Sequence, residues 1–102
     1  MKIAVEKRND TLYIRFNGEL DEYTAATLRR ETDELLQSHI GVLSAVFDLT
    51  GISFLDSTAI GFLLGRYKTY LRHNVRTYIS NPSLSADKIL TMSGVYTLMP
   101  KI

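Results

Sequence analysis

The segment SFLDSTAIG, residues 53–61, places an aspartate and two adjacent hydroxyl side chains directly before a stretch of helical periodicity. A serine or threonine hydroxyl is a nucleophile when a general base lies within hydrogen-bond reach, and it is also an acceptor for a phosphoryl group. These residue types also cap helices, because their side chains accept hydrogen bonds from the free amides of the first turn. Asp56 or Ser57 is therefore expected to cap a helix, which is the most common role for such residues.

The two histidines do not supply the base that a serine nucleophile needs. His39 closes the first predicted helix, and His73 lies several helical turns beyond Ser57. Neither histidine is paired at metal-ligand spacing, the chain has no cysteine, and GFLLGRYKT lacks the spacing of a phosphate-binding loop. We therefore predict that the chain is not an enzyme and holds no cofactor or metal.

Two glycines lie on the same face of the predicted helix as Ser57, because residues three and four apart are neighbours on a helix surface. This face comprises Ser57, Gly61, Gly65, Lys68 and Arg72. Each glycine costs about 1 kcal/mol relative to alanine in a helix interior, so we expect a close neighbour on this face. That neighbour is either a strand or helix of the same domain or another protein that reaches the Ser57 hydroxyl.

The apolar residues of this helix predict its buried side. They recur at i, i+3, i+4 and i+7, and are Ile60, Leu63, Leu64, Tyr67 and Leu71. Phe62 falls outside this stripe and is expected to be partly exposed beside Thr58, where it would contact either a partner or a loop. The basic residues Arg66, Lys68, Arg72 and His73 are interpreted as a solvated helix end and are left out of the site.

The rest of the chain predicts a mixed sheet. KIAVEK and TLYIRFNG alternate apolar and polar residues across a short RND turn, which indicates an antiparallel hairpin. A helix should run from Thr24 to near His39 and Gly41, and VLSAVFDL is typical of a central strand. HNVRTYIS predicts a further strand, and a last helix should follow Pro82 and stop near Gly94.

These elements favour a single α/β domain over residues 1–102. Its mixed sheet of four to five strands begins with the antiparallel hairpin, and helices pack against it. With 102 residues and 45% hydrophobic composition the chain can build one core. Ligands of such domains tend to lie where strands pass into helices, and Ser57 lies at one of these junctions.

Charge and hydropathy suggest no partner beyond other proteins. Lysine and arginine total 12 against 11 acidic residues, a net charge of +1 that does not favour nucleic acid or an anionic membrane. The N-terminus lacks the apolar core of a secretory signal. A membrane-spanning helix needs about 18 apolar residues, and every apolar run of the sequence is much shorter. We expect a cytoplasmic protein.

Three segments, GELDEYTAATL, DLTGISFLDSTAIGFLLGRYK and TMSGV, resemble the anti-sigma factor antagonist family of the STAS superfamily, in particular its sporulation members. The resemblance implies a switch protein that is bound and phosphorylated by an anti-sigma factor with serine kinase activity. The unmodified form would capture the kinase and free the sigma factor, the phosphorylated form would not, and a serine phosphatase would reset it.

The resemblance also implies the site residues. Ser57 matches the phosphorylated serine, and Thr58 is the alternative acceptor because relatives often have a second serine there. Asp21 aligns with an aspartate near the partner surface, although it could equally cap the turn before the first helix. Glu19 makes the same loop acidic, which would complement a basic patch on the kinase. The predicted partner-binding residues are Glu19, Asp21, Asp56, Thr58, Gly61, Phe62 and Gly65.

Phosphate chemistry is consistent with such a switch. A phosphate adds about −1.5 to −2 charges, which a helix N-terminus tolerates but which a partner surface built for a neutral hydroxyl does not. We therefore expect release of the partner with little change of fold. The alternative is a STAS domain that acts as a scaffold in a larger assembly; a monomer when free would favour the switch.

Overall fold

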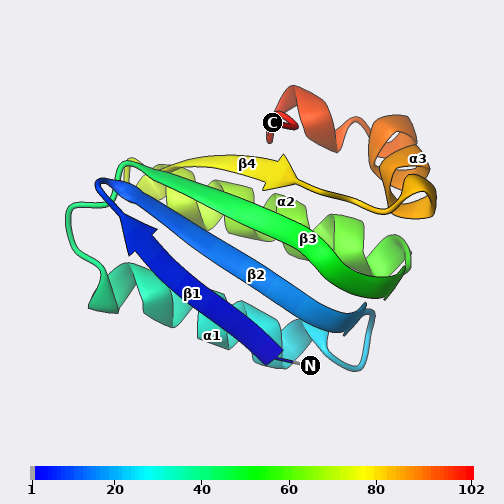
Figure 1. The fold of residues 1–102 in the computed structure, drawn as a ribbon, viewed down its shortest axis with the longest axis horizontal. Coiled ribbons are helices and arrows are strands. Elements are labelled where there is room, and N and C mark those ends of the chain that lie inside the picture. The colour runs from blue at the N-terminus through cyan, green and yellow to red at the C-terminus, as the bar shows by residue number, and fades with distance from the viewer. Residues whose placement is uncertain (1) are drawn as a thin grey trace.

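The computed structural model describes residues 2–102, and side chains from residue 3 onward. Its elements are β1 (Lys2–Arg8), β2 (Thr11–Leu20), α1 (Ala25–Ser38), β3 (Ser44–Leu55), α2 (Ser57–Arg72), β4 (Arg76–Ser80), α3 (Leu84–Ser93) and the short 3-10 helix η1 (Val95–Thr97). The four strands form one sheet in the order β1-β2-β3-β4 (Figure 1). The predicted α/β class, strand number and initial hairpin are confirmed.

The sheet is mixed because its connections differ in length. β1 and β2 are joined by a tight turn at Asn9, which has a positive φ of 56°, and they pair antiparallel with Val5 opposite Ile14. β2 to β3 and β3 to β4 are parallel pairs, whose connections run through α1 and α2. The two parallel connections bring the loops before α1 and α2 to the same end of the sheet.

β3 is longer than the apolar run VLSAVFDL indicated, since it continues to Leu55. Gly51 permits this continuation beside β2. A Cβ at Gly51 would lie 2.6 Å from the carbonyl oxygen of Phe16 and 2.5 Å from Oδ1 of Asn17. The strands therefore approach too closely here for any side chain, and β3 reaches the start of α2 without a break.

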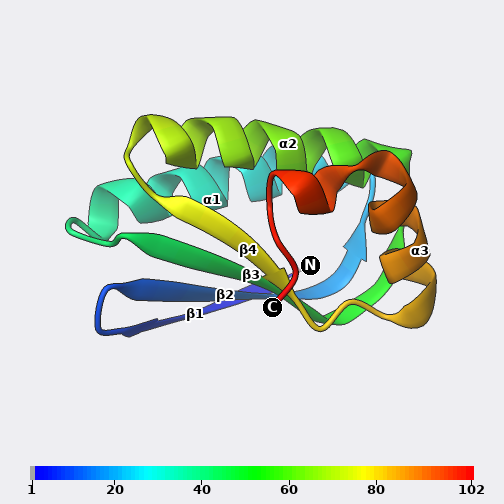
Figure 2. The same cartoon turned by 90° about the horizontal axis from the view of Figure 1, so that it is seen from above.

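The two long helices cover one face of the sheet (Figure 2). Inward-facing residues of β2 and β3 pack with helix residues in a single core that includes Leu12, Ile14, Phe16, Ala45, Phe47, Leu49, Leu28, Leu36, Leu63 and Tyr70. The Tyr70 hydroxyl donates a buried hydrogen bond of 2.6 Å to the carbonyl oxygen of Thr32, which joins α2 to α1. This bond and the shared core hold the two helices side by side.

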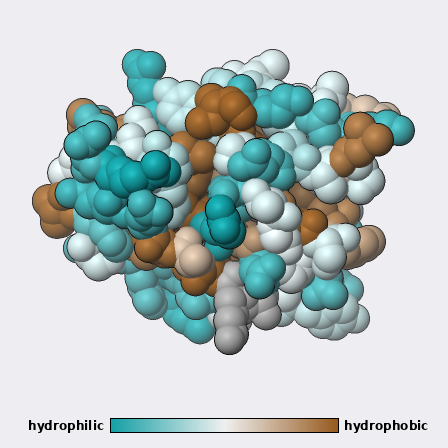
Figure 3. All heavy atoms as spheres, in the orientation of Figure 1, coloured by the Kyte–Doolittle hydropathy of each residue, from teal (hydrophilic) through white to brown (hydrophobic). Residues whose placement is uncertain are grey.

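No helix of residues 2–102 covers the other face of the sheet, which is turned to the viewer in Figure 3. Its surface mixes hydrophilic and hydrophobic side chains. The Arg8 guanidinium lies 4.0 Å over the Tyr13 ring, and Arg15 Nε lies 3.3 Å from Asp48 Oδ2. The arginine side chains on the exposed strands thus have an aromatic ring or a carboxylate as partner. None of the described helices is long and apolar enough to cross a membrane.

The helix boundaries agree with the predicted signals. α1 begins after Thr24 and ends at His39, and α3 stops at Gly94, whose left-handed φ of 81° suits glycine. Ser83 caps α3 by accepting a hydrogen bond from the Ala86 amide at 3.2 Å. These boundaries depend on local interactions, which sequence patterns report well.

The predicted buried stripe of α2 is wrong in part. The buried residues are Ala59, Phe62, Leu63, Arg66 and Tyr70, whereas Leu71 is 49% exposed. Ile60, Leu64 and Tyr67 are only partly buried. The cause is α1: α2 packs against both the sheet and this neighbouring helix, so its buried side is shifted by about one residue toward α1.

Candidate functional site

Ser57 is the first residue of α2, and its hydroxyl is free of the capping role. The cap is Asp56, whose backbone is extended and whose Oδ1 accepts the amide of Thr58 at 2.9 Å. Ser57 is exposed, and its hydroxyl has no hydrogen-bond partner in the part of the chain that the structure describes. Of the two expected caps, Asp56 performs that role and Ser57 presents its hydroxyl at a helix N-terminus.

The loop before α1 lies beside this junction. Leu20 and Leu55 are partners in the β2–β3 register, and the Asp56 amide donates to the Leu20 carbonyl oxygen at 3.4 Å. Asp21 follows Leu20 directly, and Glu19 precedes it on β2 as an exposed residue. The parallel sheet therefore gathers Glu19, Asp21 and Asp56 at one end of the domain.

Asp21 has a structural role in its own loop. Its Oδ1 accepts hydrogen bonds from the amides of Tyr23 at 2.9 Å and Thr24 at 3.1 Å. The Thr24 hydroxyl donates to the Glu19 carbonyl oxygen at 3.1 Å, which ties the end of β2 to the start of α1. Of the two roles predicted for Asp21, turn stabilisation is observed, and partner binding stays a prediction.

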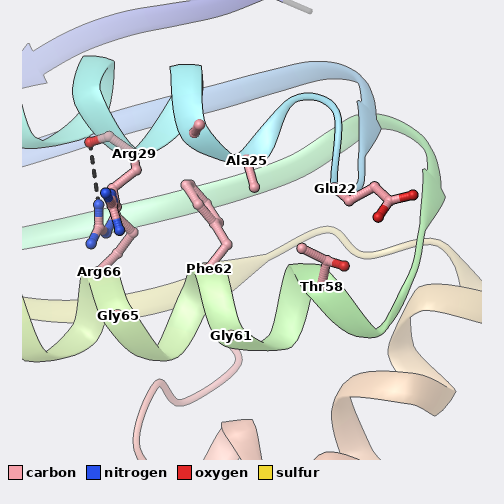
Figure 4. A pocket seen from close by; sticks show the side chains of 9 residues that line it. Glu22, Ala25, Arg29, Thr58, Gly61, Phe62, Gly65 and Arg66 are labelled. Carbon is pink, nitrogen blue, oxygen red and sulfur yellow. Dashed lines mark hydrogen bonds between the residues drawn. The ribbon is translucent and has the colours of Figure 1, made fainter.

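A groove of about 490 Å³ runs between α1 and α2 from this end of the domain. Its lining is Glu22, Ala25, Ala26 and Arg29 on the α1 side, with Thr58, Gly61, Phe62, Gly65 and Arg66 on α2 (Figure 4). Four of the predicted partner-binding residues, Thr58, Gly61, Phe62 and Gly65, are therefore brought together on one wall. The groove lies next to Ser57 along the same helix.

The two α2 glycines leave room for a side chain among the described residues. A Cβ built at Gly61 or at Gly65 meets no atom within 4 Å, beyond the helix's own nearby backbone. Of the two explanations for these glycines, close packing of a strand or helix of the same domain is excluded. Approach by another protein stays a prediction.

The predicted exposure of Phe62 is wrong. Its side chain is 7% exposed and points toward α1, where it forms the floor of the groove (Figure 4). The ring packs edge-on against Phe16 of β2 at a centroid distance of 6.1 Å. Phe62 is buried because α2 packs against α1 as well as the sheet. The apolar periodicity of α2 alone does not show the contact with α1.

The interpretation of Arg66 as part of a solvated helix end is also wrong. Arg66 is 5% exposed, its Nη1 lies 3.0 Å from Asp33 Oδ1, and the same atom donates to the Arg29 carbonyl oxygen at 3.2 Å. Burial lowers the pKa of Arg66, while the carboxylate of Asp33 acts in the opposite direction. The spacing of Arg66 from Ala59, Phe62 and Tyr70 was the signal that could have found it.

Neither histidine lies beside Ser57. The His39 and His73 rings lie at the C-terminal ends of α1 and α2, where each Nδ1 is 3.0 Å from a backbone carbonyl oxygen. Within residues 2–102 no cluster of three metal-ligating side chains is present. The exposed hydroxyl and the adjacent groove instead form a surface that another protein can contact.

Comparison with known proteins identifies the family. The STAS domain model matches residues 2–102, and an anti-sigma F factor antagonist from Paenibacillus polymyxa is 31% identical over 104 residues, covering 98% of this chain and 85% of the relative. The chain belongs to the STAS domain family and, within it, to the anti-sigma factor antagonists. A second anti-sigma F factor antagonist, from Lysinibacillus sphaericus, is 31% identical and covers 84% of this chain and 73% of the relative.

Solved structures of an antagonist share the fold. Unphosphorylated SpoIIAA superposes with a TM-score of 0.80 at 26% identity, covering 99% of this chain and 88% of SpoIIAA. The phosphorylated form of Bacillus SpoIIAA superposes with a TM-score of 0.71 at the same identity, over 99% of this chain and 91% of that one. The likeness to the STAS antagonists thus spans nearly the whole chain in both sequence and structure.

Proposed function

We propose that this STAS protein is an anti-sigma factor antagonist that works by partner switching. Its unphosphorylated form binds a kinase-type anti-sigma factor and releases the sigma factor, and phosphorylation of Ser57 abolishes that binding. A serine phosphatase restores the active form. The protein acts in the cytoplasm, is a monomer when free, and makes no direct contact with nucleic acid or membrane. The relatives named as antagonists of anti-sigma F and anti-sigma-B factors support this proposal.

The observation that carries the proposal is the state of the Ser57 hydroxyl. It is exposed at the first residue of α2, and Asp56 performs the capping role in its place. A kinase can therefore reach the hydroxyl without breaking a hydrogen bond of the fold. The adjacent groove offers the same partner a recessed contact surface next to the modified atom.

Electrostatics explain how a phosphate at Ser57 would release the partner without unfolding the domain. The free amides and the dipole of the α2 N-terminus favour an anion, so the domain tolerates the new charge. The partner meets about two additional negative charges beside the Asp56 carboxylate, on a surface that had fitted a neutral hydroxyl. Glu19 and Glu22, both exposed at this end, add to the negative potential.

Thr58 is the alternative acceptor, and its surroundings differ from those of Ser57. Its side chain projects toward the start of α1, on the side where Glu22 lies (Figure 4). A phosphate on Thr58 would enter the groove and face the Glu22 carboxylate, whereas Ser57 precedes the groove-lining residues. We therefore assign the acceptor role to Ser57.

Binding to the kinase-type anti-sigma factor of the same organism tests the proposal. Calorimetry before and after incubation with ATP should show tight binding that falls by about a hundredfold once Ser57 carries phosphate. Fragment mass spectrometry locates the phosphate. Ser57→Ala should bind but resist modification, and Thr58→Val, the matched control, should be modified normally.

Two other outcomes would contradict parts of the proposal. Phosphate on Thr58 in the wild-type chain would keep the switch but show that the acceptor assignment is wrong. Absence of binding and of modification, together with a large homomeric particle on sizing, would refute the switch and favour a scaffold STAS domain.

A further inference from the structure

The glycines of α2 lower the stability of the fold and have no packing role within it. Gly61 and Gly65 are one turn apart in the interior of a sixteen-residue helix, and a Cβ at either position would meet nothing within 4 Å. At Gly51, by contrast, an added Cβ would lie 2.6 Å from the carbonyl oxygen of Phe16, so packing requires a glycine there. The facing wall of the groove is also made of small residues, Ala25 and Ala26.

The groove has opposite charges at its two ends. Glu22 lies at the end nearest Thr58, and Arg29 and Arg66 lie at the other (Figure 4). Neither Glu22 nor Arg29 forms an ion pair with any of the described residues, and Arg66 shares its charge with the single carboxylate of Asp33. One end of the groove therefore carries an uncompensated negative charge and the other an uncompensated positive charge.

Arg29 gives this groove an exposed cation, and Arg66 lies buried beside it. Although the residue is nine-tenths buried, its Nε has no hydrogen-bond partner in the described part of the chain. Its close ion pair with Asp33 at 3.0 Å does not have the geometry of a hydrogen bond, so that contact leaves bonding capacity unused. Arg66 Nε and Asp33 Oδ1 are both shielded from solvent, so a ligand in the groove does not reach them. Such a ligand meets the exposed guanidinium of Arg29, for which a carboxylate is the strongest acceptor that a protein supplies.

The walls of the groove restrict the shape of what can occupy it. Both are helices, whose backbone groups are already paired within α1 and α2, so an extended peptide would find no backbone partners there. A helix brings its own backbone hydrogen bonds, and helices pack at interaxial distances of about 8–10 Å, which small residues at the crossing make possible. Gly61 and Gly65 lie on one side of α2 and permit such a crossing.

We propose that an amphipathic helix of the partner lies in the α1–α2 groove and crosses α2 over Gly61 and Gly65. Apolar side chains of that helix cover the Phe62 floor, an acidic side chain reaches Arg29, and a basic side chain lies opposite Glu22. This inference rests on the proposed function, because it names the part of the kinase-type anti-sigma factor that contacts the site.

Alanine substitution of the glycines tests the close approach. In calorimetry with the kinase-type anti-sigma factor, the double variant Gly61→Ala, Gly65→Ala should bind about tenfold more weakly or worse, because two methyl groups fill the crossing point. Its melting temperature should be no lower than that of the wild type, which excludes misfolding as the cause. Unchanged affinity in a variant that folds would overturn the inference.

A charge reversal tests the acidic contact. Arg29→Glu should weaken binding by about tenfold, whereas Arg30→Glu, its matched control, should change affinity less than twofold. Arg30 is exposed, lies next to Arg29 in the chain, does not line the groove and pairs only with Glu34 at 4.0 Å. Equal effects of the two reversals would show a general charge effect and overturn the acidic contact.

Cross-linking identifies the occupant. The chain has no cysteine, so Ala26→Cys provides a single attachment point for a photo-reactive group on the groove wall. Cross-linked partner residues should recur at i, i+3, i+4 and i+7, and Arg30→Cys should give none of them. Cross-links to consecutive residues or to a loop would refute the helix. Failure of the wild-type chain to bind the partner at all would instead overturn the proposed function.

Discussion

Replacing the groove glycines with alanine should stabilise the free protein. A substitution in a helix interior normally raises stability through helix propensity unless the new methyl group clashes. At Gly61 and Gly65 the added Cβ meets no atom within 4 Å, so no clash offsets the gain. Both positions have ordinary helical backbone, since the positive-φ glycines of the described chain lie elsewhere, at Gly18, Gly41 and Gly94.

The size of the effect follows from the propensity scale. Each Gly→Ala substitution should raise the free energy of unfolding by about 1 kcal/mol, and the double variant by about 2 kcal/mol. For a domain of this length 1 kcal/mol corresponds to about 4–8 °C in melting temperature. The double variant should therefore melt about 8–16 °C above the wild type.

Thermal and urea unfolding followed by circular dichroism measure these shifts, and Gly51→Ala is the matched control. Its Cβ would lie 2.6 Å from the Phe16 carbonyl oxygen, so this variant should melt below the wild type. A lower melting temperature for Gly61→Ala or Gly65→Ala would refute the reasoning, because it would mean that the fold itself needs the space on this face of α2.

Substitutions at three further positions test a helix cap, a buried hydrogen bond and a carboxylate of the sheet. Asp56→Ala should lower the free energy of unfolding by about 1 kcal/mol in urea titrations, because the Thr58 amide loses its acceptor. Asp56→Asn should retain most of this ~1 kcal/mol, and equal losses in the two variants would contradict the capping role. Tyr70→Phe removes the buried 2.6 Å hydrogen bond to Thr32 and should cost about 1 kcal/mol. Burial also raises the pKa of Tyr70, so the free energy of unfolding of the wild type should fall as the pH rises above about 10. If Tyr70→Phe loses as much stability as the wild type over this pH range, the loss does not come from Tyr70. Two opposite effects act on the pKa of Asp48. Burial raises this pKa, and hydrogen bonds, led by those from Thr50, lower it by a larger amount, so the pKa in the folded protein lies below 3.8. The stability that Asp48 contributes is therefore present above about pH 4 and is lost as the pH falls through the folded pKa. In a titration of the free energy of unfolding from pH 6 to 2, Asp48→Asn should reduce the loss of stability at low pH. An unchanged slope would show that other carboxylates cause that loss.

The order of elements was predictable from the sequence because it depends on local patterns. Alternation in β1 and β2, the cap signal at Asp56 and the stop at Gly94 all reflect interactions between residues a few positions apart. The position of Ser57 at a junction of strand and helix follows from the same patterns. The extension of β3 to Leu55 did not, because it depends on the close approach of β2 at Gly51.

Part of the groove lining was predictable from the sequence, but the groove itself was not. Gly61 and Gly65 were selected from one helix face and Thr58 from the family resemblance, and the structure shows that all three border a groove. Phe62 was expected to be exposed and forms the floor, and Arg66 was left out and lines the wall. Both errors have one cause, which is that the second wall of the groove belongs to α1.

By itself, then, the sequence determined which segments are helices and strands, where the helices begin and end, and that a hydroxyl stands at the start of α2. These features depend on backbone propensity, capping and periodicity, which act over one or two turns of chain. Only the tertiary structure decided which sector of α2 is buried and that its glycines face open space. The angle at which two helices meet over a sheet depends on contacts between residues such as Tyr70 and Thr32, which are 38 positions apart, and no local pattern contains that information.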